Sequence, residues 1–211
     1  MFRMTAALLG LALFACSGYA QDPAQAPAAS QPTRAPTAQE LLRRADQFVS
    51  RIPELLRAGR SAEVTQQAYD TLRDLESLLQ ADAENSEALV VLAELLIYTR
   101  DFDRARRTFK QVLDKEPANY RANLGLGRQY LDSHYPRQAT GYLETAARVA
   151  PPQSRAETLR LLATSLAAEG KRVRAVSTAE EAVSVDPTNV ASLSTLIEMY
   201  LENEQVEKAL E

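Results

Sequence analysis

The chain has few of the side chains that usually carry catalysis or bind metals. Among 211 residues there is one cysteine, one histidine and no tryptophan. The histidine, His134, falls in a predicted turn between two helices, where solvent contact is more common than a role as a general base. The sequence also has no glycine-rich phosphate loop, cluster of metal ligands or nucleophile elbow. We therefore predict that the chain is not an enzyme, and we assign no catalytic residue, metal, cofactor or small-molecule substrate.

The balance of charge argues against a second class of partner. Lys and Arg number 24 and Asp and Glu number 28, which gives a net charge of −4 at neutral pH. Proteins that bind nucleic acid generally do so by neutralising phosphates with Lys and Arg. We therefore expect no nucleic-acid partner. The hydrophobic content of 45% is enough for one continuous core.

Residues 1–20 have the pattern of a bacterial export signal. Arg3 precedes an apolar run over residues 6–15, and Ala20 stands before Gln21 at a small-residue cleavage site. The apolar run is about ten residues long, too short for a permanent membrane-spanning helix. We expect cleavage after Ala20 and a location in the bacterial periplasm or at the periphery of the outer membrane.

A second interpretation of the same segment depends on Cys16. Leu13, Phe14, Ala15 and Cys16 resemble the lipobox of bacterial lipoproteins, in which the cysteine becomes the lipidated first residue. Cleavage after Ala20 would instead remove the cysteine, and with it any disulfide or thiolate zinc site. The two interpretations exclude each other. Contact with a membrane is expected only through this lipid anchor.

A linker and then a pair of helices that differs from the later repeat units follow the signal. Residues 21–37 are rich in Pro and Ala and have little to bury, so we predict a disordered linker. Thr37 opens a helix with a capping box, and Pro53 is expected to kink that helix or end it early. Ser61 is expected to cap a second helix. We interpret residues 38–85 as a divergent N-terminal helix pair that shields the repeats after it.

The strongest signal in the chain is an internal repeat. A leucine and a later alanine each recur at intervals of 34, 36 and 34 residues, namely Leu92, Leu126, Leu162 and Leu196, and Ala105, Ala139, Ala175 and Ala209. Apolar residues spaced three and four apart around them predict two helices in each unit. Such units bury their apolar faces only against their neighbours, so they are expected to stack into one continuous core.

Proline and asparagine mark the limits of the units. The second helix of each unit is expected to end before Pro117, Pro151 or Pro187, and Asn119 and Asn189 are expected to cap the helix that follows. The longer interval has a local explanation in the pair Pro151 and Pro152, after which Ser154 begins a capping box with Glu157. The units predicted in this way are residues 86–119, 120–153, 154–189 and an incomplete fourth, 190–211.

These units resemble the tetratricopeptide repeat family, in which a pair of antiparallel helices has small residues at unit positions 8, 20 and 27 and proline at position 32. In the second unit these positions hold Gly127, Ala139, Ala146 and Pro151. The resemblance implies an all-α fold, a right-handed α-solenoid of antiparallel helix pairs. Two departures are visible: the first helices lack the usual tryptophan, and His134 replaces the turn glycine.

The resemblance also implies where a partner binds, because ligands of this family commonly lie in the concave groove lined by the first helix of each unit. Tyr98 and Leu124 would be apolar anchors there, and three arginines would be donors to acidic or carbonyl groups. The alternative is that these residues form solvated helix faces. The expected partner-binding residues are Glu94, Tyr98, Arg121, Leu124, Arg128, Arg160 and Thr164.

These features together predict a non-enzymatic scaffold or adaptor of the bacterial cell envelope that binds protein or peptide segments in its groove. The fourth unit stops early in its second helix, and this favours an alternative. In that alternative the repeats are the N-terminal arm of a longer enzyme or outer-membrane export channel that continues beyond Glu211.

Overall fold

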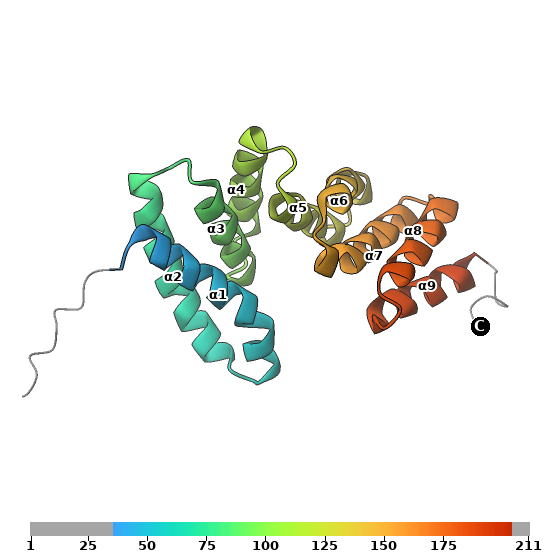
Figure 1. Ribbon diagram of the computed structural model, residues 1–211, viewed down its shortest axis with the longest axis horizontal. Helices are drawn as coiled ribbons and strands as arrows, with labels where there is room; N and C mark the ends of the chain where they lie inside the picture. The colour runs from blue at the N-terminus through green and yellow to red at the C-terminus, as the bar shows by residue number, and fades with distance from the viewer. Residues whose placement is uncertain (1–35, 204–211) are drawn as a thin grey trace, which may run out of the picture. The chain divides into compact units, whose positions relative to one another are not determined.

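The computed structural model describes residues 36–203, which form nine α-helices and no strand (Figure 1). The expected all-α solenoid is thereby confirmed. None of the helices in this range is both long and apolar enough to cross a membrane. The expected export signal, Cys16, most of the expected linker and the end of the fourth unit lie outside the described residues. The helices are α1 (Ala38–Arg57), α2 (Ser61–Ala81), α3 (Ser86–Tyr98), α4 (Phe102–Lys115), α5 (Tyr120–Asp132), α6 (Pro136–Val149), α7 (Pro152–Ala168), α8 (Arg172–Val185) and α9 (Val190–Glu202).

The helices form an inner and an outer row, because each pair contributes one helix to each. In the inner row, α1 contacts α3, α3 contacts α5, α5 contacts α7, and α7 contacts α9. In the outer row, α2, α4, α6 and α8 make no such contact with one another within residues 36–203. Each outer helix instead packs on the inner helix before it and the inner helix after it (Figure 1). Closer spacing in one row curves the stack toward that row.

Neighbouring helix pairs share their apolar core. Phe109 of α4 is among the largest fully buried side chains, and it clusters with Ala93 of α3 and Leu126 of α5. The ring lies so close to α5 that a Cβ atom on Gly125 would stand 2.4 Å from the ring atom Cζ. A larger residue does not fit there unless the buried ring moves. The glycine therefore allows α4 and α5 to pack closely.

The turns inside the helix pairs share one backbone conformation. Gly59, Arg100, His134 and Gly170 all have φ angles between 61° and 79°. Glycine adopts this left-handed conformation without steric cost, whereas other residues do so less readily. His134 thus occupies the place of a turn glycine, as the sequence indicates, and it is exposed.

Three of the predicted helix caps are present. The side chain of Thr37 accepts a hydrogen bond from the backbone N–H of Glu40 at 3.3 Å. The side chains of Asn119 and Asn189 accept in the same way from the third residue after each, at 3.1 and 3.0 Å. Each bond satisfies a backbone donor that the first turn of a helix leaves free.

Two predicted caps are wrong. Ser61 does not precede α2 but is its first residue, and Arg60 stands at the cap position without a side-chain hydrogen bond. Ser154 lies inside α7, which begins at Pro152. Proline has a φ angle that suits the first helical position and needs no N–H there, so the helix starts two residues before the expected capping box.

Pro53 does not end α1 early, since the helix continues to Arg57. Residues on both sides of the proline are buried in the core, Ile52 completely and Leu55 almost so. Burial of these two side chains outweighs the backbone hydrogen bond that proline cannot make. Tertiary packing therefore overrides the local preference here.

Replacing Gly125 by Ala is expected to destabilise the fold by about 1 to 3 kcal/mol, because the added Cβ overlaps the buried Phe109 ring. Gly141 of α6 is the matched control, since a Cβ there would meet nothing within 4 Å. Gly141→Ala is expected to stabilise by up to about 1 kcal/mol through helix propensity. Urea denaturation measures the free energy of unfolding of both variants. Equal stability of the two variants would contradict the close packing of α4 on α5.

Candidate functional site

The inner row carries a cavity between α1, α3 and α5, here named the inner cavity, with a volume of about 320 Å³. Val49 and Ile97 add apolar surface to it, and Gln129 and Asp132 add polar groups. Five of the seven expected binding residues line it, namely Glu94, Tyr98, Arg121, Leu124 and Arg128.

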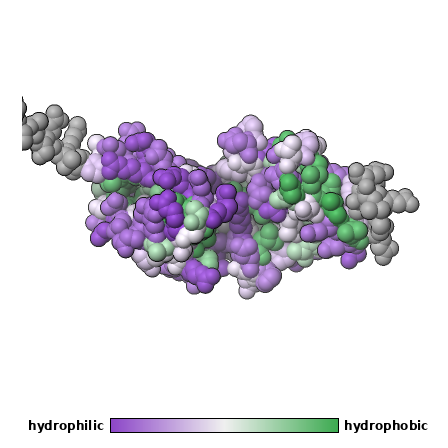
Figure 2. All heavy atoms as spheres, turned by 90° about the horizontal axis from the view of Figure 1, so that it is seen from below, coloured by the Kyte–Doolittle hydropathy of each residue, from purple (hydrophilic) through white to green (hydrophobic). Residues whose placement is uncertain are grey.

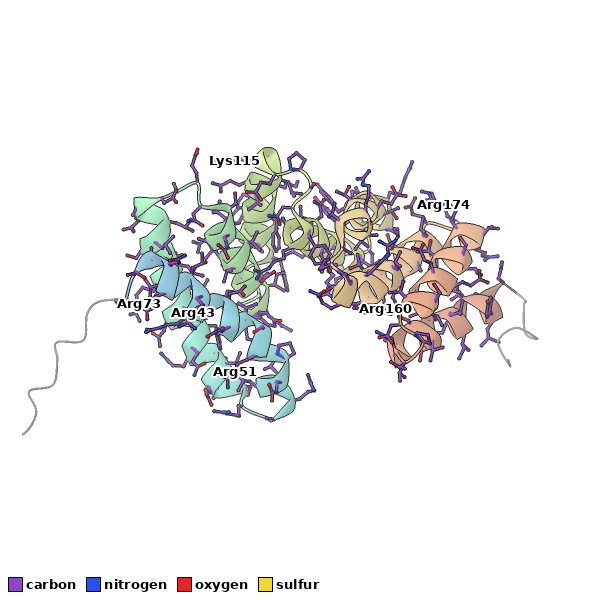
Figure 3. All side chains as sticks on the ribbon, in the orientation of Figure 1. Arg43, Arg51, Arg73, Lys115, Arg160 and Arg174 are labelled. Carbon is purple, nitrogen blue, oxygen red and sulfur yellow. The ribbon has the colours of Figure 1, made fainter. Side chains whose placement is uncertain are left out.

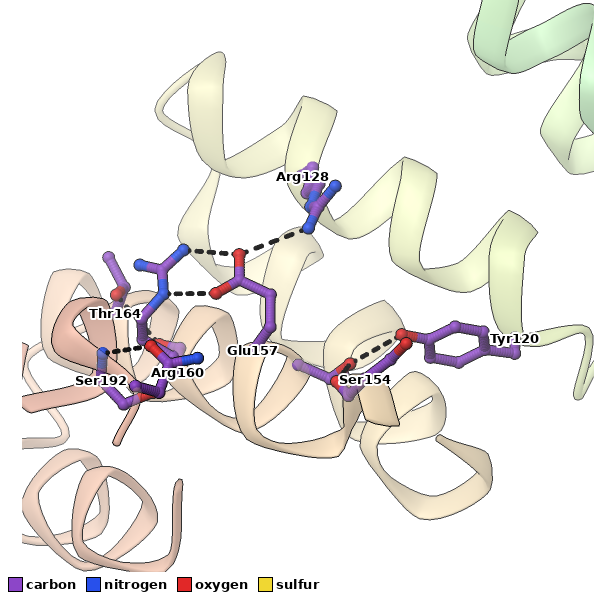
Figure 4. A network of polar contacts seen from close by, with 9 residues as sticks. Tyr120, Arg128, Ser154, Glu157, Arg160, Thr164 and Ser192 are labelled. Carbon is purple, nitrogen blue, oxygen red and sulfur yellow. Dashed lines mark hydrogen bonds and ion pairs between the residues drawn. The ribbon is translucent and has the colours of Figure 1, made fainter. Parts of the chain in front are cut away.

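The other two expected residues, Arg160 and Thr164, lie on α7 outside the inner cavity. Thr164 lines a separate cavity of about 290 Å³ together with Thr195 and Met199 of α9. Arg160 lines neither of these two cavities and instead pairs with Glu157 (Figure 4). The structure thus brings five of the expected residues together and separates two.

Arg121 links three helices of the inner row. Its Nε donates to Glu94 of α3 at 2.9 Å, and its Nη1 lies 2.7 Å from a carboxylate oxygen of Asp46 in α1. Burial alone would lower the pKa of Arg121, but the two carboxylates outweigh it and raise that pKa. The guanidinium of α5 is therefore a fixed positive charge that joins α1 and α3.

Glu157 of α7 makes a second link, between α7 and α5 (Figure 4). Arg160 donates through Nε and Nη2 to both carboxylate oxygens of Glu157 at 2.7 and 2.8 Å, and Arg128 donates to one of them at 3.3 Å. Burial acts to raise the pKa of Glu157, but Arg160 and Arg128 together hold that pKa below its usual range. The carboxylate is thus ionised at neutral pH.

All three arginines of the expected groove are therefore already paired with carboxylates of this chain. An acidic ligand would have to compete with those carboxylates. The charged residues that line the inner cavity are Glu94, Arg121, Arg128 and Asp132, and their charges sum to zero. The inner cavity offers less free positive charge than the sequence suggests.

Tyr98 keeps its proton at neutral pH. The side chain is 40% exposed at the edge of the inner cavity. Burial raises the pKa of Tyr98, the charge of Glu94 raises it further, and Arg128 opposes both. The phenol therefore presents a hydrogen-bond donor beside an apolar ring, a combination that is frequent at protein interfaces.

Sequence reasoning missed two residues of this region, Asp46 and Gln129. Asp46 was missed because α1 does not follow the repeat register. Gln129 was missed because its place in the unit is buried rather than part of the expected groove, and it is only 5% exposed. The aligned units contained a signal, since the same place holds Leu95 in the unit before and Met199 two units later, both buried. A glutamine thus stands at a buried place that holds an apolar residue in two of the other units and Ser165 in the third.

Basic side chains are spread over several helices rather than gathered in one stripe (Figure 3). Of those labelled there, Arg73, Lys115, Arg160 and Arg174 each lie in an ion pair. Among residues 36–203, no group of three or more His, Cys, Asp or Glu side chains is arranged to hold a metal ion. We consider the inner cavity for binding because it gathers five of the expected residues.

Replacing Arg121 by Met is expected to destabilise the fold by about 1 to 3 kcal/mol, because the carboxylate of Glu94 loses its partner while remaining largely covered. That carboxylate side chain is 21% exposed. Arg174→Met is the matched control, because the Arg174 side chain is 58% exposed in its pair with Glu144, and exposed pairs contribute at most about 1 kcal/mol. Thermal unfolding compares the variants. Equal losses would show that the link across three helices adds no stability.

The ion pairs of Glu157 are expected to make stability depend on pH. Its pKa is lowered in the folded chain, so the folded state binds this proton less readily than the unfolded state, where the pKa is about 4.3. The stabilisation is complete above that value and is lost as the pH falls through the folded pKa. We expect the stability difference between the wild type and Glu157→Gln to shrink below about pH 4. A difference that stays constant from pH 7 to pH 3 would contradict this.

The sequence pattern of the tetratricopeptide repeat family matches residues 99–162. A solved structure described as MamA 41-end from Desulfovibrio magneticus RS-1 superimposes with a TM-score of 0.64 at 21% identity, over 82% of this chain and 92% of that one. A crystal structure of MamA gives a TM-score of 0.63 at 17% identity, over 70% and 85% of the two chains.

No curated protein sequence matches the chain. The identities to the solved structures are below 25%, so these structures establish a shared helical fold and nothing more specific. The match to the tetratricopeptide repeat pattern covers α4, α5, α6 and part of α7. Residues 99–162 therefore match the tetratricopeptide repeat, and residues 36–203 form an all-α solenoid of helix pairs.

Proposed function

We propose that the chain is a non-enzymatic scaffold that binds a segment of a partner protein in the inner cavity. Tetratricopeptide repeats and the solenoid fold support a protein-interaction scaffold in general. The inner cavity supports this particular site. It lies on the row where helices of successive pairs are neighbours, so a bound segment would contact α1, α3 and α5 at once.

The composition of the inner cavity suits a protein segment. Val49, Ile97 and Leu124 provide apolar surface, and the half-exposed Tyr98 provides an aromatic ring with a donor. Tyrosines surrounded by apolar residues are common among the residues that contribute most to binding. The volume is at the lower end of the roughly 300 to 1,000 Å³ found for ligand sites. One or two side chains of a partner fill it, whereas a folded domain does not.

We assign the protein to the bacterial cell envelope, in the periplasm or at the periphery of the outer membrane, and its partner segments to envelope proteins. The support for this assignment is the sequence pattern of residues 1–20. The mass of the exported protein distinguishes its two forms, because one begins at Gln21 and the other carries a lipid on Cys16. A cytoplasmic protein with an intact N-terminus would contradict both.

A second candidate function is that the repeats are the arm of a longer enzyme or outer-membrane export channel. An apolar stripe on α9 favours it. Val190, Leu193, Ile197 and Leu201 are three or four residues apart and exposed. In Figure 2, hydrophobic residues gather over the C-terminal helices. Terminal repeats are usually polar on their outer face, so the stripe suits a further helix pair. An open reading frame that continues past Glu211 would support this candidate.

Replacing Leu124 by Arg is expected to abolish capture of partner proteins from an envelope extract, because the apolar wall of the inner cavity gains a charge that binding would bury. Val173→Arg is the matched control, since Val173 is 78% exposed on α8. A photo-crosslinking residue at Tyr98 identifies the segment that is bound. Thermal unfolding shows that both variants are folded. Equal capture by the two variants would remove the inner cavity from the binding site.

A further inference from the structure

Gln129 of α5 is a buried amide without a hydrogen-bond partner. Both its Oε1 and its Nε2 are covered, and neither has a partner among the described residues. A buried polar group that makes no hydrogen bond destabilises a folded protein. Leu95 and Met199 hold the corresponding place in other units, so an apolar residue fits this backbone. The amide thus lowers stability at a place where the fold has no need of it.

Gln129 also lines the inner cavity. No hydrogen bond holds its carboxamide in the position seen. A glutamine side chain turns between staggered positions at χ1 and χ2 and over a broad range at χ3, so the amide is able to turn toward the cavity that the residue lines. There it offers an acceptor and a donor side by side.

The peptide group is the ligand chemistry that matches this pair. In an extended chain, the N–H and C=O of one residue point to the same side, and antiparallel strands exchange both bonds through such residues. A carboxamide can replace one of the two strands, since its oxygen accepts from the N–H and its nitrogen donates to the C=O. Gln129 can thus satisfy both of its groups with one residue of an extended segment.

The remainder of the inner cavity favours an uncharged segment. Arg121 and Arg128 are already paired with carboxylates, so an acidic segment finds no free cation among them. Leu124 of α5 and Ile97 of α3 offer apolar surface in the same cavity. An aliphatic side chain next to the bound peptide group would bury its surface there.

We propose that Gln129 recognises the main chain of an extended, uncharged peptide segment whose aliphatic side chain enters the inner cavity. The proposal rests on the proposed function, that the inner cavity binds a partner segment. It adds the chemical class of that segment and names Gln129 as the residue that hydrogen-bonds to its main chain. The partner is identified by an aliphatic residue in extended conformation rather than by acidic side chains.

The test uses a phage library of random heptapeptides, selected on the immobilised full chain after counter-selection on the Leu124→Arg chain. The most enriched peptide is synthesised and serves as the probe, and fluorescence anisotropy measures its affinity. We expect the selected peptides to share an aliphatic residue and to lack a net negative charge. Enrichment of acidic peptides would overturn the proposal.

The decisive variant is Gln129→Met, which keeps the length of the side chain and removes its donor and acceptor. We expect the probe to bind at least about tenfold more weakly, because two hydrogen bonds are lost. We also expect an equal or higher melting temperature, because a buried amide without partners is removed. A lower melting temperature would show that the amide is already bonded inside the chain, for example to a buried water, and would overturn the proposal.

Methylation of one probe amide at a time locates the bond. Methylation at one position is expected to weaken binding to the wild type several-fold and to have no further effect on Gln129→Met, because both changes remove the same hydrogen bond. If the probe binds Gln129→Met as tightly as the wild type, but does not bind Leu124→Arg, this inference fails and the proposed function stands. If no peptide is enriched on the full chain, the proposed function fails as well.

Discussion

The packing of each helix pair on the next is the constraint on which the rest of the structure depends. Repeat units bury their apolar faces against their neighbours, and Phe109 of α4 is buried in one cluster with residues of α3 and α5. Gly125 permits that contact, and the same residue lines the inner cavity. The absence of a side chain at Gly125 admits the large ring from the outer row. The same residue contributes to the lining of the inner cavity.

Charge has a different role in the inner row from the one that its arginines indicate. Arg121 joins α5 to α1 and α3, and Glu157 joins α7 to α5. These pairs lie between helices that the apolar core already brings close, and they link α5 to α1, α3 and α7. The four charged residues that line the inner cavity, Glu94, Arg121, Arg128 and Asp132, also carry no net charge. Under the proposed function, recognition there depends on shape and hydrogen bonding rather than on charge.

The repeat period predicted most of the helices, because each unit places its apolar residues at the same intervals and each helix buries them in the same way. It did not predict Asp46 as one of the two partners of Arg121, since Asp46 lies in a helix outside the repeat register. It also missed the start of α7, where Pro152 begins the helix before the expected cap. The period describes what the units share. The contacts of the candidate site depend on how single residues depart from it.

Gln129 and Ser165 are two polar residues at a buried place of the repeat, and they differ in whether the fold satisfies their hydrogen bonds. They hold the same place in successive units, both are polar and both are buried. The Ser165 hydroxyl donates to the carbonyl of Pro136 at 2.9 Å and lies 2.8 Å from the hydroxyl of Thr140, so its polarity is satisfied inside the fold. The amide of Gln129 has no such partner. The same place in two units thus holds one polar side chain that is satisfied inside the fold, Ser165, and one that is not, Gln129. Of the two, Gln129 keeps hydrogen-bonding groups that a ligand could satisfy.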